Sequence, residues 1–130
     1  MADRSIVKEG LRYTSDHEWV KMEDGNARVG ITDHAQNQLT EIVFIELPQK
    51  GKHYQRGEVL GQLESVKTVA AVYAPVSGEV TEVNSILEEQ TQLINESPYD
   101  EGWLAVIKMD DPGAEDHLLD ESGYRKVIGE

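Results

Sequence analysis

Glycine and proline interrupt this sequence at short intervals, and the residues between them form short apolar runs. The runs are rich in Val, Ile, Leu and Tyr, as in LRYT (11–14), EWVKM (18–22), EIVFIELP (41–48) and GWLAVIKM (102–109). Short β-branched and aromatic segments bounded by turn residues are typical of strands, and their close spacing favours an all-β sandwich or barrel over a helical bundle. The run 41–48 is the most apolar, so we expect a buried strand ending at Pro48.

Turn signals and two helical segments complete the predicted organisation. Asp24-Gly25-Asn26 predicts a turn between strands, and the segment 69–83 predicts two strands joined by a plain hairpin turn at 75–78. The segment TDHAQNQL (32–39) favours a short helix, which Thr32 or Asp33 would cap. The apolar spacing after residue 113 favours a short C-terminal helix, interrupted near Gly123.

The length and the ends of the chain indicate a single domain. A chain of 130 residues has room for one modest hydrophobic core. We expect residues 1–10 to form an N-terminal extension and residues 113–128 to form a C-terminal helical segment. The first ten residues, MADRSIVKEG, have neither the apolar core of a signal peptide nor the Arg- and Ser-rich character of a transit peptide. This favours a cytoplasmic protein, or the mature form of a protein imported into the mitochondrial matrix.

The charge of the chain excludes some classes of partner. It has 25 acidic and 12 basic residues, a formal net charge of −13. Such a field repels phosphate backbones, so we expect no nucleic-acid binding. No apolar run approaches the roughly 20 residues of a membrane-spanning helix, so we expect no membrane partner. The acids are scattered along the chain, which suits solubility and would also steer the protein towards positively charged partners.

The residues that usually carry catalysis form no recognisable constellation. The chain has no cysteine, which excludes disulfides and thiolate chemistry. The histidines lack the spacing of a zinc site, so we expect no metal; they are His17, His34, His53 and His117. Ser77 in PVSGE lacks the preceding Gly-x of a nucleophile elbow, and no segment has the spacing of a phosphate-binding loop. We therefore predict no catalytic residues and a protein that is not an enzyme.

One lysine stands out in the stretch GQLESVKTVAAVYAPVSGEV (61–80). Lys67 lies between two strand-like runs, at the predicted tip of a hairpin. A hairpin tip holds a side chain in solvent on a backbone fixed by strand pairing. A solvated surface lysine is the ordinary interpretation. However, the tip has no second lysine and its flanking residues are small, so an enzyme that modifies a primary amine would reach Lys67 without steric obstruction.

The residues around Lys67 resemble the lipoyl-attachment segment of the glycine cleavage system H protein family. The similarity lies in LESVKTV and YAPVSGEVTEVN, and it extends in the same order to YTSDHEWV, VGITDHAQNQL, IVFIELPQKG, LINESPYDEGWL and LLDESGYRKV. It covers nearly the whole chain, from about Leu11 to Val127. Biotin carriers place methionines around their lysine, where this chain has Val66 and Thr68. The lipoyl domains of 2-oxoacid dehydrogenases usually have an Asp-Lys-Ala tip and lack the HEW and GW segments.

The resemblance implies a fold and a role. The fold is a lipoyl/biotinyl-type barrel-sandwich hybrid, mostly β, with two small antiparallel sheets and short helices near 32–39 and at the C-terminus. Lipoic acid is implied in an amide bond to Lys67, with Glu64, Ser65 and Val66 forming the attachment motif. The implied role is a non-catalytic shuttle in glycine cleavage. Glu18, from HEW, is implied to line a cleft that shelters the loaded lipoyl arm, and an ammonium next to a carboxylate is electrostatically favourable.

The resemblance also implies the partners of the chain. Glycine decarboxylase transfers an aminomethyl group to the lipoyl arm, a tetrahydrofolate-dependent aminomethyltransferase takes the one-carbon unit, and dihydrolipoamide dehydrogenase reoxidises the arm. A lipoate ligase or lipoyl transferase would attach the cofactor. Because a carrier must present Lys67 to several enzymes in turn, we expect a monomer.

The sequence departs from the family pattern at three places. Many members have an acidic residue four positions after the lysine, where this chain has Ala71; Leu39-Thr40-Glu41 replaces Leu-Gly-Asp or Leu-Gly-Glu, and Thr91 replaces a proline. Two alternatives therefore stand beside the glycine cleavage carrier. One is a lipoate relay that donates its lipoyl group to other acceptors, for which Ala71 is tolerable. The other is an unmodified binding module that uses its acidic surface alone.

Overall fold

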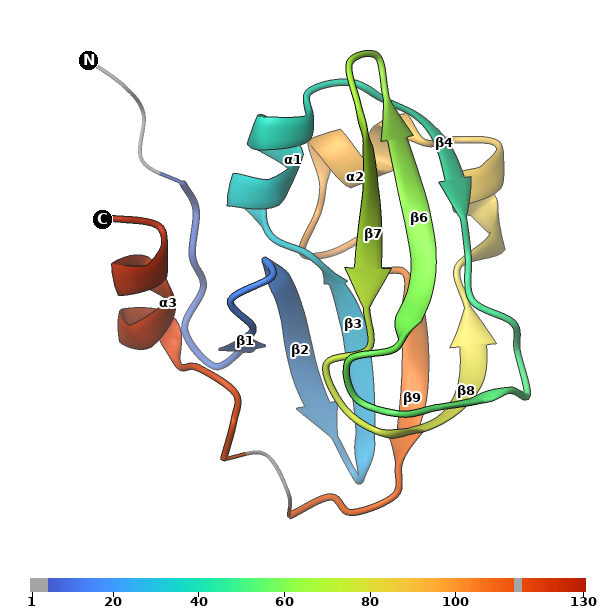
Figure 1. Cartoon of the computed structure of the whole chain (residues 1–130), viewed down its shortest axis with the longest axis vertical. Helices are drawn as coiled ribbons and strands as arrows, with labels where there is room; N and C mark the ends of the chain where they lie inside the picture. Colours follow the sequence, from blue (N-terminus) through green and yellow to red (C-terminus); the bar gives the residue numbers. More distant parts are fainter. Residues whose placement is uncertain (1–4, 114–115) are drawn as a thin grey trace.

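The strands form two antiparallel sheets that face each other in the computed structural model, which describes residues 5–113 and 116–130 (Figure 1). The larger sheet has six strands in the order β1-β2-β3-β9-β8-β5, and the smaller has three in the order β4-β6-β7. The strands are β1 (Arg12–Tyr13), β2 (Glu18–Glu23), β3 (Asn26–Ile31), β4 (Ile42–Glu46), β5 (His53–Tyr54), β6 (Val59–Ser65), β7 (Val69–Tyr73), β8 (Gly78–Val83) and β9 (Ala105–Met109). This arrangement confirms the predicted fold class.

Short helices connect and flank the sheets. They are α1 (Asp33–Leu39), the 3₁₀ helix η1 (Ser85–Glu88), α2 (Gln92–Glu96) and α3 (Glu121–Val127). The helix predicted at 32–39 is confirmed as α1. The predicted cap is Thr32, whose side chain accepts a hydrogen bond from the Ala35 N–H at 3.2 Å. In the described part of the chain, no helix combines the length and the apolar character needed to cross a membrane.

The predicted turn at Asp24-Gly25 joins β2 and β3. Both residues have positive φ, 51° for Asp24 and 83° for Gly25, as a two-residue hairpin turn that follows the twist of the strands requires. In the same hairpin Trp19 lies opposite Gly30, and a Cβ atom at Gly30 would come within 2.6 Å of the indole ring. The missing side chain thus leaves room for the buried Trp19, whose indole N–H donates to the Pro98 carbonyl at 2.8 Å.

The hydrophobic core lies between the two sheets and continues under the helices. Towards one end of the two sheets, a cluster joins Leu60 of β6 to residues of the six-stranded sheet, among them Val20, Val29, Val80 and Ile107. Towards the other end, a second cluster joins the inner residues of the three-stranded sheet to α1, η1 and α2; it includes Ile42, Ile45, Leu63, Val72, Leu39, Leu87 and Ile94. The inner residues of the smaller sheet therefore lie in the core, which supports the hairpin below its exposed tip.

Two predictions about strands are wrong. The run 41–48 does not form a fully buried strand, because Val43 and Phe44 are exposed on β4 while only Ile42 and Ile45 point into the core. The turn at 75–78 does not close a hairpin, since β7 belongs to the three-stranded sheet and β8 to the six-stranded sheet. The segment crosses from one sheet to the other.

The predicted short C-terminal helix is confirmed as α3, although its details differ from the prediction. The C-terminal helix spans Glu121–Val127 rather than most of 113–128, and Gly123 does not interrupt it. Gly123 lies in the first turn, where its N–H donates to the side chain of Asp120 at 2.8 Å. Residues 114–115, and residues 1–4 of the predicted extension, lie outside the described residues. Within residues 5–10, Val7 packs in a third cluster with Tyr13, Trp19 and Tyr124.

Candidate functional site

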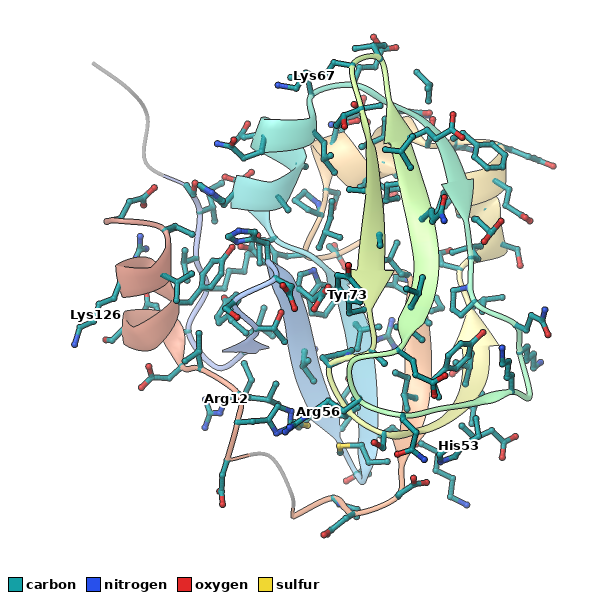
Figure 2. The ribbon with its side chains drawn as sticks, in the orientation of Figure 1. Arg12, His53, Arg56, Lys67, Tyr73 and Lys126 are labelled. Atoms are coloured by element: carbon teal, nitrogen blue, oxygen red, sulfur yellow. The ribbon has the colours of Figure 1, made fainter. Side chains whose placement is uncertain are left out.

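Lys67 lies at the tip of the hairpin formed by β6 and β7, as predicted. Figure 2 shows its side chain at the top of the molecule, next to α1. The turn is closed by a hydrogen bond from the Ser65 N–H to the Thr68 carbonyl at 2.8 Å. The Ser65 hydroxyl oxygen then accepts the N–H groups of Lys67 at 3.2 Å and Thr68 at 3.1 Å. Ser65 thus fixes the backbone that presents the exposed lysine.

The other predicted residues of the attachment motif surround this turn. Glu64 and Val66 are exposed, and the Val66 N–H donates to the Glu41 carbonyl at 3.0 Å. This bond ties the tip to the residue preceding β4, in addition to the strand pairing of the hairpin. Lys67 takes part in no ion pair within residues 5–113 and 116–130. The structure therefore offers a free primary amine on a rigid support.

We expect Ser65→Ala to loosen the tip without unfolding the protein. The substitution removes the acceptor of two turn N–H groups, which corresponds to about 1 kcal/mol of unfolding free energy. Amide hydrogen exchange at Lys67 and Thr68 should accelerate, and urea denaturation should show the stability loss. Thr68→Ala is the matched control, because the bonds of Thr68 within the turn come from its backbone. Equal exchange at the tip in Ser65→Ala and the wild type would contradict this role of Ser65.

A cleft of about 150 Å³ runs beside the hairpin. It lies between the β6–β7 pair on one side and α1 with the start of β2 on the other. Its lining is apolar on the hairpin side and polar at the β2 end; the residues are Asp16, His17, Glu18, Ile31, Ala35, Gln38, Leu39, Leu63, Ala70, Ala71 and Val72. The structure thus brings Glu18 and Ala71 together in one cleft, although they are far apart in the sequence.

Glu18 is the buried carboxyl group of this cleft, with an exposed fraction of 2 %. One carboxyl oxygen accepts the Thr14 hydroxyl at 2.7 Å, and the other accepts the N–H of Tyr73, the last residue of β7, at 3.0 Å. Burial raises the pKa of Glu18 from its ordinary 4.5 to about 7, although both hydrogen bonds act in the opposite direction. The group therefore titrates near neutral pH and can meet a cation as a carboxylate.

His17 also lines the cleft, and no role was predicted for it from the sequence. It has a positive φ of 70°, and its Nδ1 lies 2.8 Å from the hydroxyl of Tyr124, which in turn lies 2.7 Å from the hydroxyl of Thr32. Burial, and then the neighbouring His34, lower the pKa of His17. This chain of contacts links the loop before Glu18 to α3 and to the cap of α1. In the residues that the structure describes, no group of three or more His, Asp or Glu side chains could hold a metal ion.

The fold and the hairpin lysine define a class of protein. Two facing antiparallel sheets with an exposed lysine at a tight hairpin tip are the features of lipoyl/biotinyl-type carrier domains. The model of the family described as "Glycine cleavage H-protein" matches residues 11–130. The chain therefore belongs to the glycine cleavage H-protein family, the lipoyl carriers of glycine cleavage.

Individual relatives agree with this assignment. The chain is 49% identical to the glycine cleavage system H protein of Geobacillus kaustophilus, over 92% of this chain and 94% of the relative. It is 51% identical to that of Chlorobium limicola, over 95% of this chain and 98% of the relative. Among solved structures, a glycine cleavage system H protein from Mycobacterium marinum superposes with a TM-score of 0.88 at 36% identity, covering 95% of this chain and 100% of that one.

Proposed function

We propose that Lys67 carries lipoic acid in an amide bond, and that the chain is a non-catalytic aminomethyl carrier of the glycine cleavage system. The observation that supports this most directly is the free amine of Lys67 on a fixed hairpin beside a cleft that contains a buried carboxyl group. In this role the lipoyl group would supply two sulfur atoms that accept and release the transferred group and cycle between disulfide and dithiol. The protein would supply presentation and shelter.

The dimensions of the hairpin suit such an arm. A lysine side chain with a lipoyl group extends about 10–15 Å. Ala71 lies on β7, four residues after Lys67, which corresponds to at most about 13 Å of extended backbone. An arm folded back along β7 would therefore place its end in the cleft, near Ala71 and within the region that Glu18 lines. Leu63, Ala70 and Val72 would contact its hydrocarbon part.

The electrostatics of the cleft suit a cationic end group. An ammonium carried by the arm would be attracted to the Glu18 carboxylate, and more strongly than in water because the site is buried. Ala71 contributes no charge, but Asp16 lines the cleft as well. Two carboxyl side chains thus remain available in spite of the departure at position 71. We propose that Glu18 and Asp16 together hold the loaded arm.

The proposed partners are the enzymes that act on the arm in turn. They are glycine decarboxylase, the tetrahydrofolate-dependent aminomethyltransferase, dihydrolipoamide dehydrogenase, and a lipoate ligase or lipoyl transferase. The net charge of −13 would steer the carrier towards positively charged surfaces at their active-site entrances. A single lipoyl-carrier domain acting as a monomer in the cytoplasm is the form of the protein that we propose.

Reconstitution tests this function. Lipoylated protein is mixed with the decarboxylase, the aminomethyltransferase, the dehydrogenase, glycine, tetrahydrofolate and NAD⁺, and NADH formation is followed. We expect NADH only when the lipoylated chain and all three enzymes are present. Lack of turnover with lipoylated chain would contradict the proposal, and so would glycine oxidation by the chain without the enzymes. Transfer of its lipoyl group to other acceptors, without glycine oxidation, would identify a lipoate relay instead.

A further inference from the structure

Exposed apolar side chains gather around the Lys67 tip. In the described part of the chain, the large hydrophobic residues with high exposure include Val43 and Phe44 on β4, Val66 in the turn, and Val69 at the start of β7. The exposed fraction of Phe44 is 53 %. Val43 and Phe44 are adjacent on β4, and Val66 and Val69 lie on the hairpin that pairs with β4, so this side of the sheet leaves apolar side chains in contact with water. Exposed apolar surfaces commonly bind a partner.

A β-bulge creates this surface. Along β4, Ile42 pairs with Ser65 and Phe44 pairs with Glu64, so two steps on β4 correspond to one step on β6. Val43 is the extra residue of the bulge. Because of the bulge, Val43 and Phe44 are both exposed, while Ile42 and Ile45 on either side remain in the core. Bulges redirect side chains and are frequent next to functional sites.

The surface is rigidly connected to the tip. Phe44 pairs with Glu64 on β6, and Glu64 pairs with Val69 on β7, so these residues form one row across the three strands. At the end of the row, the Val66 N–H bonds to the Glu41 carbonyl at 3.0 Å, and the Ile42 N–H bonds to the Asn95 side chain of α2 at 3.0 Å. β4 therefore holds Phe44 at a fixed position relative to Lys67.

Selective modification of Lys67 needs recognition beyond the amine itself. The other lysines of the chain are also exposed; they are Lys8, Lys21, Lys50, Lys52, Lys108 and Lys126. We propose that Val43 and Phe44, together with Val66 and Val69 of the hairpin, form the surface by which the lipoyl-attaching enzyme recognises Lys67. This proposal rests on the proposed function, because it presupposes that Lys67 is lipoylated.

The charges around this apolar surface indicate which kind of enzyme surface would bind to it. Three exposed glutamates lie here, Glu41 just before β4, Glu46 on β4 and Glu64 on β6, and neither strand contains a lysine or arginine. The matching surface is an apolar pocket for Phe44 with basic residues at its rim. The enzyme would present lipoate as its acyl adenylate, formed from ATP with release of pyrophosphate. The Lys67 amine attacks the acyl carbon, and the amide bond forms as the bond between the acyl carbon and the phosphate oxygen breaks. AMP leaves, and the proton lost by the amine nitrogen passes to solvent.

Initial rates of lipoylation test the proposal. Purified unmodified protein is incubated with an adenylate-forming lipoate ligase, ATP and lipoate, and the lipoylated fraction is measured by intact mass. We expect Phe44→Ser to lower kcat/KM at least tenfold, mainly through KM, because it removes the aromatic anchor of the interface. Phe44→Leu should keep most of the rate. Ile6→Ser is the matched control, since Ile6 has a similar exposed fraction of 58 % and lies outside the surface.

The outcomes separate this proposal from the one on which it rests. Equal kcat/KM for Phe44→Ser and the wild type would overturn the recognition surface alone. Normal lipoylation of Phe44→Ser, combined with slower glycine cleavage, would also overturn it and would assign the surface to a later partner. A wild type that gains no lipoyl group would overturn both proposals. Circular dichroism and thermal denaturation should show the wild-type fold in Phe44→Ser, because the side chain points away from the core.

Discussion

Lys67→Arg should abolish lipoylation and all glycine cleavage activity. Arginine keeps the positive charge and a similar length, but its guanidinium remains protonated and therefore cannot attack the activated lipoyl group. The fold should be unaffected, because Lys67 is exposed and forms no ion pair in the described residues. NADH formation in the reconstituted system, with intact mass in parallel, measures the effect. We expect activity at the level of a reaction without the carrier.

Lys126→Arg is the matched control for this substitution. Lys126 is also exposed, and Figure 2 shows it on α3, away from the hairpin tip. The Lys126→Arg variant should be lipoylated at Lys67 and fully active. Retained activity of Lys67→Arg would contradict the carrier mechanism and would favour a binding module that acts through charge alone.

Glu18→Gln should have the second large effect, which appears first in the pH dependence of stability. The folded-state pKa of Glu18 is raised from 4.5 to about 7. Between these two pH values, the Glu18 side chain is protonated in the folded protein but ionised in the unfolded chain. Its contribution to stability is therefore complete below pH 4.5 and is lost as the pH rises to about 7. The loss amounts to about 3 kcal/mol of unfolding free energy.

Urea denaturation at pH 4.5 and pH 7.5 measures this contribution. Glutamine mimics the protonated carboxyl group, so Glu18→Gln should lose less stability between these pH values than the wild type, by about 3 kcal/mol. Glu88→Gln is a suitable control, because Glu88 is an exposed residue of η1. The same pH dependence in Glu18→Gln and the wild type would contradict the raised pKa.

The same substitution should shorten the life of the loaded arm. With Glu18 neutralised, an ammonium in the cleft loses the attraction of its buried counter-charge. We expect ammonia release from loaded carrier, in the absence of the aminomethyltransferase, to be roughly tenfold faster at pH 8 in Glu18→Gln. An unchanged release rate would mean that Glu18 does not shelter the arm, and would leave Asp16 as the carboxylate to test.

Local signals in the sequence were sufficient for several parts of the fold. Asp24-Gly25 supplies the positive φ values of the β2–β3 turn, and Thr32 supplies the cap of α1. The Lys67 tip was predictable because short β-branched runs flank a small polar break. The family resemblance then indicated the sheets, and the comparisons confirmed it.

Other features depend on contacts that the pattern of residues does not contain. The exposure of Val43 and Phe44 results from a register shift between β4 and β6, whereas an apolar run alone indicates burial. The crossing of 75–78 between sheets depends on which strands pair, not on the turn residues. The helices η1 and α2 are too short to show a helical period.

The candidate site was only partly predictable for the same reason. Lys67 and its motif are contiguous in the sequence, but the cleft combines residues from β2, β3, α1, β6 and β7. Glu18 was indicated by resemblance, and its raised pKa follows from burial, which only the fold reveals. His17 contacts Tyr124 and, through it, Thr32, and both residues are far from it in the sequence.

Intact mass measurement of the protein purified from cells supplied with lipoate, followed by peptide mapping of residues 61–80, shows whether Lys67 carries a lipoyl group. We predict a mass increment of one lipoyl group, located on Lys67 and absent from Lys67→Arg. An unmodified Lys67, in cells whose other lipoyl proteins are modified, would contradict it.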